Sequence, residues 1–186
     1  MNSEDPYAYP GSSVLRNRLG ILDPEELDVV ERRLVYEPMT SEISRIILNA
    51  APVCFVIHSL VHLRAALTAA SSLGDPVIAL SAPGASAYAG AAWFAALVRQ
   101  GEAEFPNVPF IAILDCGDRA GDVLSALGTG LKHLVFTGHP EALRRLKAIA
   151  AESGAEILDR RPEAFDLVNR RAPERAARAW CQASSE

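Results

Sequence analysis

The sequence predicts an α/β protein with a parallel sheet in residues 51–165, and two observations carry this prediction. Short apolar runs, such as the one at residues 53–57, are continuous and do not alternate in polarity, which is typical of strands that helices cover on both faces. Alanine-rich stretches separate the runs, and strands that alternate with helices form right-handed βαβ units with parallel strands. With 49% hydrophobic residues, the 186-residue chain can form its core without disulfides or metals.

Five strands and five helices are expected in this region. The strands are predicted at residues 53–57, 76–80, 109–114, 133–136 and 156–158. The helices are predicted at residues 60–73, 87–105, 120–128, 141–153 and 163–169. A closed eight-stranded barrel needs roughly 250 residues, so the sheet should be either a half barrel or an open, doubly wound sheet.

A short helical segment is predicted ahead of the sheet. Pro24 follows an N-cap candidate at Asp23, which is a typical helix start. Leu27, Val30 and Leu34 then form a narrow apolar stripe at helical spacing. A helix with such a stripe is expected to dock on another part of the protein.

A second amphipathic stretch at residues 40–49 leads into the sheet, with Ile43, Ile46 and Ile47 on one side. After Pro173 a frayed helix is expected. The predicted organisation is an N-terminal helical segment at residues 1–38, a domain of βα repeats at residues 39–170 and a tail at residues 171–186.

The charge and cysteine content exclude several classes of protein. A net charge of -5 and a pI near 5.4 argue against nucleic-acid binding, because phosphate backbones attract clustered Lys and Arg. The three cysteines are far apart and form no CxxC pair, which indicates neither a disulfide framework nor a zinc knuckle and favours a reducing compartment such as the cytoplasm. The start is polar and acidic, and no apolar run reaches the roughly 20 residues that span a bilayer, so no membrane association is expected.

Small and polar residues follow every predicted strand. The carboxyl ends of parallel strands meet at one edge of the sheet, where ligands of α/β proteins bind. Asp115, at the end of the third strand, is therefore the candidate catalytic residue. The candidate ligand-binding residues are His58, Ser59, Ser81, Gly84, Cys116, Thr137 and Gly138.

The alternative interpretation is that these polar residues only satisfy turns and cap helices, as Ser59, Asp118 and His139 could. Asp118 is better explained as the N-cap of the following helix than as a second carboxylate acting with Asp115. His62 and His133 are predicted to lie away from the strand ends, in structural or exposed positions.

Three stretches of the sequence, each with a predicted strand, resemble in their order the first half of class II, metal-dependent fructose-bisphosphate aldolases. They are FVIHSL at residues 55–60, DPVIALSAPGA at 75–85 and VPFIAILDCG at 108–117, and the resemblance covers residues 51–158. It implies a half-barrel fold. Aldolases of this class end the third strand in His-Leu-Asp-His, where the Asp transfers a proton and the second His binds zinc.

In this chain the corresponding positions hold Ile113-Leu114-Asp115-Cys116. The resemblance therefore implies a proton-transfer position at Asp115 and places Cys116 where the family has a metal ligand. The family's later histidines and glycine-rich phosphate loops have no counterpart in the sequence. No metal site and no cofactor are therefore expected, although a thiolate at Cys116 could ligate zinc.

A second resemblance covers residues 7–36. The run YPGSSVLRNRLGI at residues 9–21, followed by the helix from Pro24, is similar to the opening segment of Fic (Fido) proteins, which transfer AMP or related groups to hydroxyls. The Fic catalytic string begins His-Pro-Phe, whereas His139-Pro140 continues here as Glu141. The resemblance thus implies no nucleotide transfer.

The sequence leaves three hypotheses on function. The first is a small-molecule-binding α/β domain of aldolase-like ancestry, non-catalytic or with altered chemistry. The second is a lyase or proton-transfer enzyme that uses Asp115 with Cys116 and His58. The third is a Fic-associated interaction or regulatory protein. Because a half barrel leaves strand edges uncovered, a homo-oligomer or an intramolecular cap is also expected.

Overall fold

The computed structural model describes residues 53–74 and 76–184, which form an α/β unit with six parallel strands and six helices. The elements are β1 (Val53–Ile57), α4 (Leu60–Leu73), β2 (Val77–Ser81), α5 (Ala85–Tyr88), α6 (Ala91–Glu104), β3 (Phe110–Asp115), α7 (Ala120–Gly128), β4 (His133–Val135), α8 (Pro140–Glu152), β5 (Glu156–Leu158), β6 (Phe165–Asp166) and α9 (Pro173–Ala183). The predicted α/β class and parallel sheet are confirmed. The helical segment and the Fic-like opening predicted ahead of the sheet lie outside the described residues. Among the described residues, no helix combines the length and the apolar character needed to cross a membrane.

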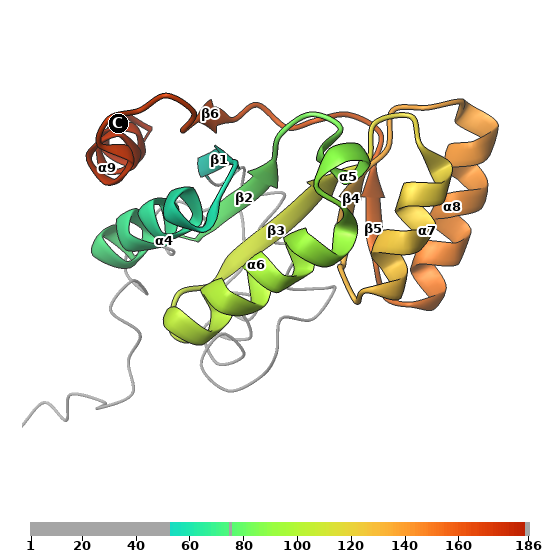
Figure 1. Cartoon of the computed structure of the whole chain (residues 1–186), viewed down its shortest axis with the longest axis horizontal. Helices are drawn as coiled ribbons and strands as arrows, with labels where there is room; N and C mark the ends of the chain where they lie inside the picture. Colours follow the sequence, from blue (N-terminus) through green and yellow to red (C-terminus); the bar gives the residue numbers. More distant parts are fainter. Residues whose placement is uncertain (1–52, 75, 185–186) are drawn as a thin grey trace, which may run out of the picture.

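The strands lie in the order β5-β4-β3-β2-β1-β6, and every pair of neighbours is parallel. From β1 to β5 the order follows the chain without a reversal. Right-handed crossovers that always step in one direction place all their helices on the same face of the sheet. Figure 1 shows this arrangement, with the helices packed along one side of the strands.

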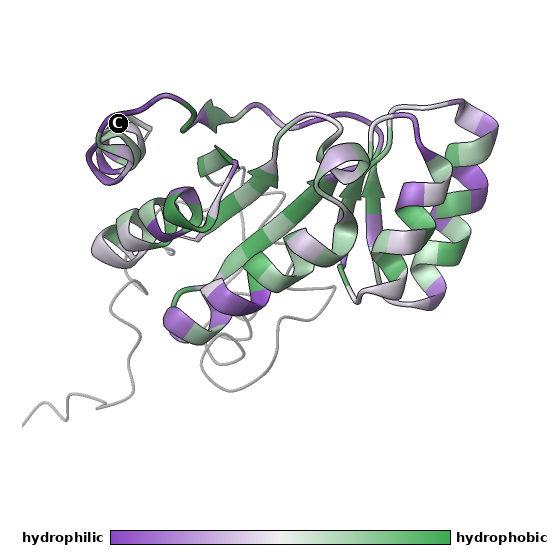
Figure 2. Ribbon diagram, viewed as in Figure 1, coloured by the Kyte–Doolittle hydropathy of each residue, from purple (hydrophilic) through white to green (hydrophobic). Residues whose placement is uncertain are grey.

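The two faces of the sheet contribute to two separate cores. On the first face, Phe55, Ala79 and Leu114 pack with buried side chains of the helices. The second face carries Cys54, Val56, Ile78, Leu80, Ile111, Ile113 and Val135, whose cluster includes no residue from a described helix. The strands are hydrophobic along most of their length in Figure 2, because both faces are apolar.

The helix predicted at residues 87–105 is divided into α5 and α6. Gly90, between them, has a φ of 82°, a left-handed value that a residue with a Cβ adopts only with strain. The glycine therefore allows the chain to change direction before α6 begins. Phe94 of α6 is fully buried in the core of the first face.

The prediction of a helix at residues 163–169 is wrong, because this segment forms β6 and a turn. Phe165 pairs with Phe55 in the neighbouring strand β1, and Leu167 is fully buried. Phe165 also packs edge-on against the Phe55 ring. These contacts join residues that are far apart in the sequence, and they override the local helical pattern.

The helix predicted in the tail is regular and packed, so the expectation of fraying is wrong. α9 packs against α4, next to it in Figure 1, with Ala177 and Cys181 buried. Trp180 stacks on Phe165, with 4.7 Å between the ring centroids. The tail is therefore packed against the sheet unit.

The connection from β5 to β6, which we call the strap (residues 159–164), joins strands at opposite edges of the sheet. In Figure 1 it runs along the top of the molecule, across the carboxyl ends of the strands between them. This is the edge at which the sequence places the candidate site.

Candidate functional site

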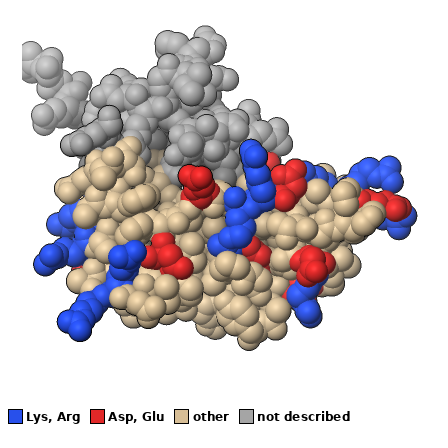
Figure 3. Space-filling view, turned by 90° about the horizontal axis from the view of Figure 1, so that it is seen from above, with Lys and Arg blue, Asp and Glu red and all other residues tan. Residues whose placement is uncertain are grey.

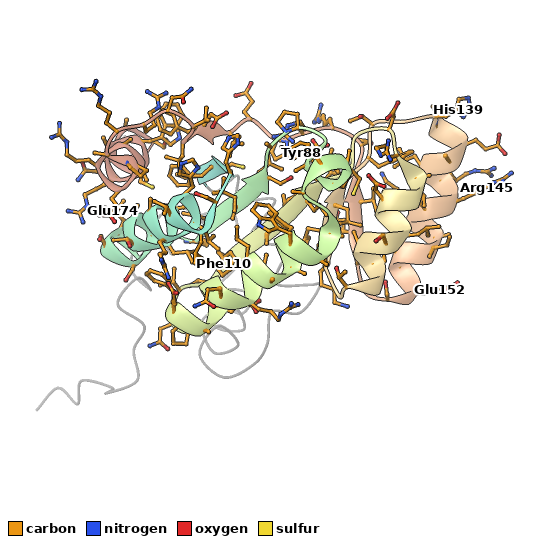
Figure 4. The ribbon with its side chains drawn as sticks, in the orientation of Figure 1. Tyr88, Phe110, His139, Arg145, Glu152 and Glu174 are labelled. Carbon is orange, nitrogen blue, oxygen red and sulfur yellow. The ribbon has the colours of Figure 1, made fainter. Side chains whose placement is uncertain are left out.

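The carboxyl edge of the sheet faces the viewer in Figure 3, where acidic and basic side chains of the described residues are interspersed. Tyr88 of α5 and His139, which precedes α8, lie at this end of the molecule in Figure 4, and Glu152 lies at the opposite end. The predicted site residues divide into two groups at this edge. One surrounds Asp115 and the other surrounds His58.

Asp115 ends β3 and is 2% exposed. Its Oδ1 accepts hydrogen bonds from the backbone N–H groups of Gly84 (3.0 Å) and Gly117 (2.7 Å). Its Oδ2 accepts a hydrogen bond from Nη1 of Arg161 in the strap. Both carboxylate oxygens are therefore engaged by donors from three separate loops.

Ser81 extends this network to the end of β2. Its fully buried hydroxyl accepts a hydrogen bond from the backbone N–H of Asp115 (2.8 Å) and donates one to the carbonyl of Ala82 (3.2 Å). Its own carbonyl accepts a hydrogen bond from Nη2 of Arg161 (2.9 Å). Arg161 thus fixes the strap to the ends of both β2 and β3.

Two glycines make this network possible. Gly84 and Gly117 have φ values of 60° and 55°, in the left-handed region. In this conformation their N–H groups point to the same carboxylate oxygen of Asp115. Most residues other than glycine would be strained at either position.

A proton-transferring carboxylate has to reach the reacting group of its substrate. Asp115 is buried, and its oxygens are bonded to two backbone amides and a guanidinium. This geometry favours the interpretation in which Asp115 ties the loops together. Its catalytic role stays a prediction.

Cys116 does not join Asp115 in a ligand set. Its side chain is fully buried in the core of the first face, whereas the alternation of β3 places Asp115 on the side of Ile111 and Ile113. Burial raises the pKa of the Cys116 thiol to about 12, which disfavours the thiolate that zinc requires. Within the described part of the chain, no three His, Cys, Asp or Glu residues are grouped so as to hold a metal ion.

The second group is centred on His58, which follows β1. Its Nε2 lies 2.8 Å from Oδ1 of Asp166 in the adjacent strand β6. Because a carboxylate only accepts, Nε2 carries the proton, and Nδ1 of the neutral ring is left as an acceptor. The two side chains are 29% and 44% exposed, so solvent reaches the pair.

Asp166 is held in place by its surroundings. Burial alone would raise its pKa, but the Val168 N–H and the His58 ring together hold the pKa below its ordinary value. The Val168 N–H donates to the same Oδ1 atom at 2.8 Å. Asp166 is therefore a fixed carboxylate that orients the His58 ring.

His62 lies beside this pair, so its predicted position away from the strand ends is wrong. It occupies the first turn of α4, and its ring is 5.6 Å from that of His58 between centroids. Its Nδ1 accepts a hydrogen bond from the His58 backbone N–H (3.2 Å). Burial, and then the neighbouring His58, lower the pKa of His62 and favour its neutral form.

The helix caps predicted from the sequence are partly confirmed. The Ser59 hydroxyl accepts from the His62 N–H, and Nδ1 of His139 accepts from the Glu141 N–H. The cap predicted at Asp118 is wrong: α7 begins at Ala120, and Asp118 is exposed. The acidic residue in the first turn of α7 is Asp122, whose carboxylate accepts hydrogen bonds from Ser86 and Arg119.

Thr137 and Gly138 follow β4, three strands from β1 and hence about 14 Å from the His58 group. The Thr137 N–H donates to the carbonyl of Gly117 (2.7 Å). A Cβ atom at Gly138 would lie 2.4 Å from the Phe136 ring, so the close approach requires glycine. These two residues support the loops around Asp115 and do not meet His58.

The sequence interpretation missed two residues at this edge, Arg161 and Asp166. Asp166 was hidden by the helix expected at residues 163–169, although the alternation of Phe165, Asp166 and Leu167 is the signal of a short strand. Arg161 stands in a run of charged residues with no periodicity, and nothing local distinguishes it from Arg160.

A hollow of about 320 Å³ lies at the start of α9 and contains none of the predicted site residues. The described residues that line it are Ala172, Pro173, Glu174, Arg175 and Arg178.

No protein-family model matches the chain, and no curated protein matches it.

Proposed function

We propose that the chain is a small-molecule-binding α/β domain whose ligand contacts His58 and Asp166 at the carboxyl edge of the sheet. The observation that carries this proposal is the oriented pair itself, with 2.8 Å between Nε2 and Oδ1 and both side chains partly open to solvent. Of the other candidate polar residues at this edge, Ser81 and Asp115 are buried, whereas Ser59 is partly exposed and Thr137 is exposed.

The chemistry of the pair indicates the class of ligand. Nδ1 of His58 is an acceptor in the neutral ring, and Oδ1 of Asp166 already accepts two hydrogen bonds. Asp166 supplies a partly exposed carboxylate to this group, and the Nε of Arg170 donates to its backbone carbonyl at 3.3 Å. A small molecule with hydrogen-bond donors, such as a polyol or an amine, fits this arrangement better than an anion.

The strand order supports the aldolase-like half-barrel interpretation over the doubly wound one. Doubly wound sheets reverse their strand order and carry helices on both faces. Here β1 to β5 follow one another across the sheet, as consecutive strands of a βα barrel do. This similarity concerns the winding of the chain and carries no claim about aldol chemistry.

A second candidate function is proton transfer by His58. An imidazole that is oriented by a carboxylate and partly open to solvent, as His58 is, is a common form of general base. In this function Asp166 would position His58 and stabilise the imidazolium. The lyase hypothesis based on Asp115 and Cys116, and the Fic-associated hypothesis based on residues 7–36, stay predictions.

The experiment is a ligand screen read by nuclear magnetic resonance. The chain has four histidines, so the imidazole nitrogens of a ¹⁵N-histidine-labelled sample give few signals. Polyols and amines should perturb the signals of His58 and leave those of the exposed His139 unchanged. His58→Gln should abolish binding, and His139→Gln should retain it. Binding that survives His58→Gln would contradict the proposed function.

A further inference from the structure

We propose that the second face of the sheet is covered by residues 24–49 of the same chain. This face consists of Cys54, Val56, Ile78, Leu80, Ile111, Ile113 and Val135, which come from the four consecutive strands β1 to β4. A contiguous apolar surface of this size is rarely left open to water by a soluble monomer.

The exposure of these residues shows that the face is covered. Leu80, Ile113 and Val135 are 0% exposed, and the most exposed member, Val56, is only 7% exposed. The described helices bury their side chains in the core of the first face. Leu158, the last residue of β5, and Ala164 of the strap also pack against the second face, but only at its carboxyl edge.

The length and place of the undescribed parts of the chain identify the segment that covers the second face. The described residues begin at Val53, the first residue of β1, so residues 1–52 directly precede the sheet in the sequence. The other parts of the chain outside the described range are residue 75 and residues 185–186, which are too short to cover four strands. Only residues 1–52 are long enough.

The sequence of residues 24–49 is suited to covering an apolar sheet face. Its two amphipathic stretches carry apolar stripes, one at Leu27, Val30 and Leu34 and the other centred on Ile46. A helix is about 10 Å across, and strands lie about 4.8 Å apart, so two helices cover about four strands. Four strands, β1 to β4, contribute the buried residues of the second face.

A second copy of the chain is the competing occupant, and the low exposure of the second face within one chain argues against it. A covalently attached segment also has a high effective concentration at the face, so it outcompetes a free partner of similar contact area. If residues 24–49 cover the second face, its apolar residues are shielded from water in the monomer.

The three cysteines provide a test in the full chain. Cys54 lies on the second face, whereas Cys116 and Cys181 are buried in the core of the first face. Ile46→Asp places a charge within the apolar stripe and should raise the rate of Cys54 alkylation by N-ethylmaleimide at least tenfold relative to the other two cysteines. The control Ser41→Asp adds the same charge on the opposite side of the predicted helix and should leave all three rates unchanged. An unchanged Cys54 rate in Ile46→Asp would overturn the proposal.

A second measurement applies even if Ile46→Asp unfolds the chain. A diazirine-bearing amino acid is placed at position 46 of the full-length chain, and the photo-crosslinked peptides are identified by mass spectrometry. Crosslinks within one chain to peptides of β1, β2 or β3 support the proposal. Crosslinks between two chains, or the absence of any crosslink to these strands, overturn it.

Discussion

The guanidinium of Arg161 donates a hydrogen bond to the buried carboxylate of Asp115, and this pair joins the strap to the end of β3. Asp115 is 2% exposed, while the side chain of Arg161 is 24% exposed, so the ion pair is largely shielded from solvent. Removing one member of a buried pair leaves the other charge without a partner, which is the costly case.

Arg161→Gln should therefore destabilise the protein by about 2 to 3 kcal/mol, somewhat less than for a fully buried pair because the guanidinium retains contact with water. Urea unfolding followed by circular dichroism measures the change. Arg160→Gln is the matched control, since Arg160 is exposed, and it should change the free energy of unfolding by less than about 0.5 kcal/mol. Equal effects of the two variants would show that the pair contributes nothing specific.

Asp115→Asn should destabilise the protein by about 2 to 4 kcal/mol, because it removes charge-assisted hydrogen bonds and places an amide donor opposite Arg161. Asp118→Asn, at an exposed residue, is the control. The double variant with Arg161→Gln should lose less than the sum of the single losses, by at least about 1 kcal/mol. If Asp115→Asn kept full stability but lost ligand binding, the catalytic interpretation of Asp115 would be favoured instead.

The sheet could be predicted largely because its strands are encoded locally. The apolar run at residues 53–57 is β1 to the residue, and Val77, Phe110, His133 and Glu156 begin strands within one residue of prediction. β6 could not be predicted in this way. Its two residues are strand because they pair with Phe55 and Val56, a contact that only the folded chain creates.

The candidate site was less predictable, for the same reason. Asp115 and His58 were found because they follow apolar strands, but their partners Arg161 and Asp166 come from the strap and β6. The strap reaches both groups because it crosses from β5 to the opposite edge of the sheet. No local feature of the sequence indicates that crossing, so the roles of Asp115 and His58 could not be separated beforehand.

Gly117→Ala should destabilise the protein by about 1 to 2 kcal/mol. Gly117 has a φ of 55°, a conformation in which a Cβ atom is strained. Relief of this strain would disturb the hydrogen bond from the Gly117 N–H to Asp115. The surroundings leave room for the added atom, so the cost reflects backbone conformation and not a steric clash. Gly121→Ala, within α7, should be neutral or stabilise by up to about 1 kcal/mol. Thermal unfolding of both variants checks the predicted difference in sign.

His133, at the start of β4, is buried, with 7% of its surface exposed. Burial, and then the charge of Lys132, lower its pKa from 6.5 to about 4. In the unfolded chain the imidazole takes up a proton below pH 6.5, but in the folded protein it stays neutral until about pH 4, so stability falls as the pH decreases through this window. Between pH 7.5 and pH 4.5 the free energy of unfolding should decrease by about 2.5 kcal/mol because of this residue.

His133→Leu should remove this decrease, while a smaller acid-induced decrease remains because the pKa of His62 is also lowered. In the control His139→Gln the buried imidazole is still present, so the full decrease should persist. Urea unfolding at the two pH values measures the change in the free energy of unfolding. An identical pH dependence in wild type and His133→Leu would show that His133 does not cause the decrease.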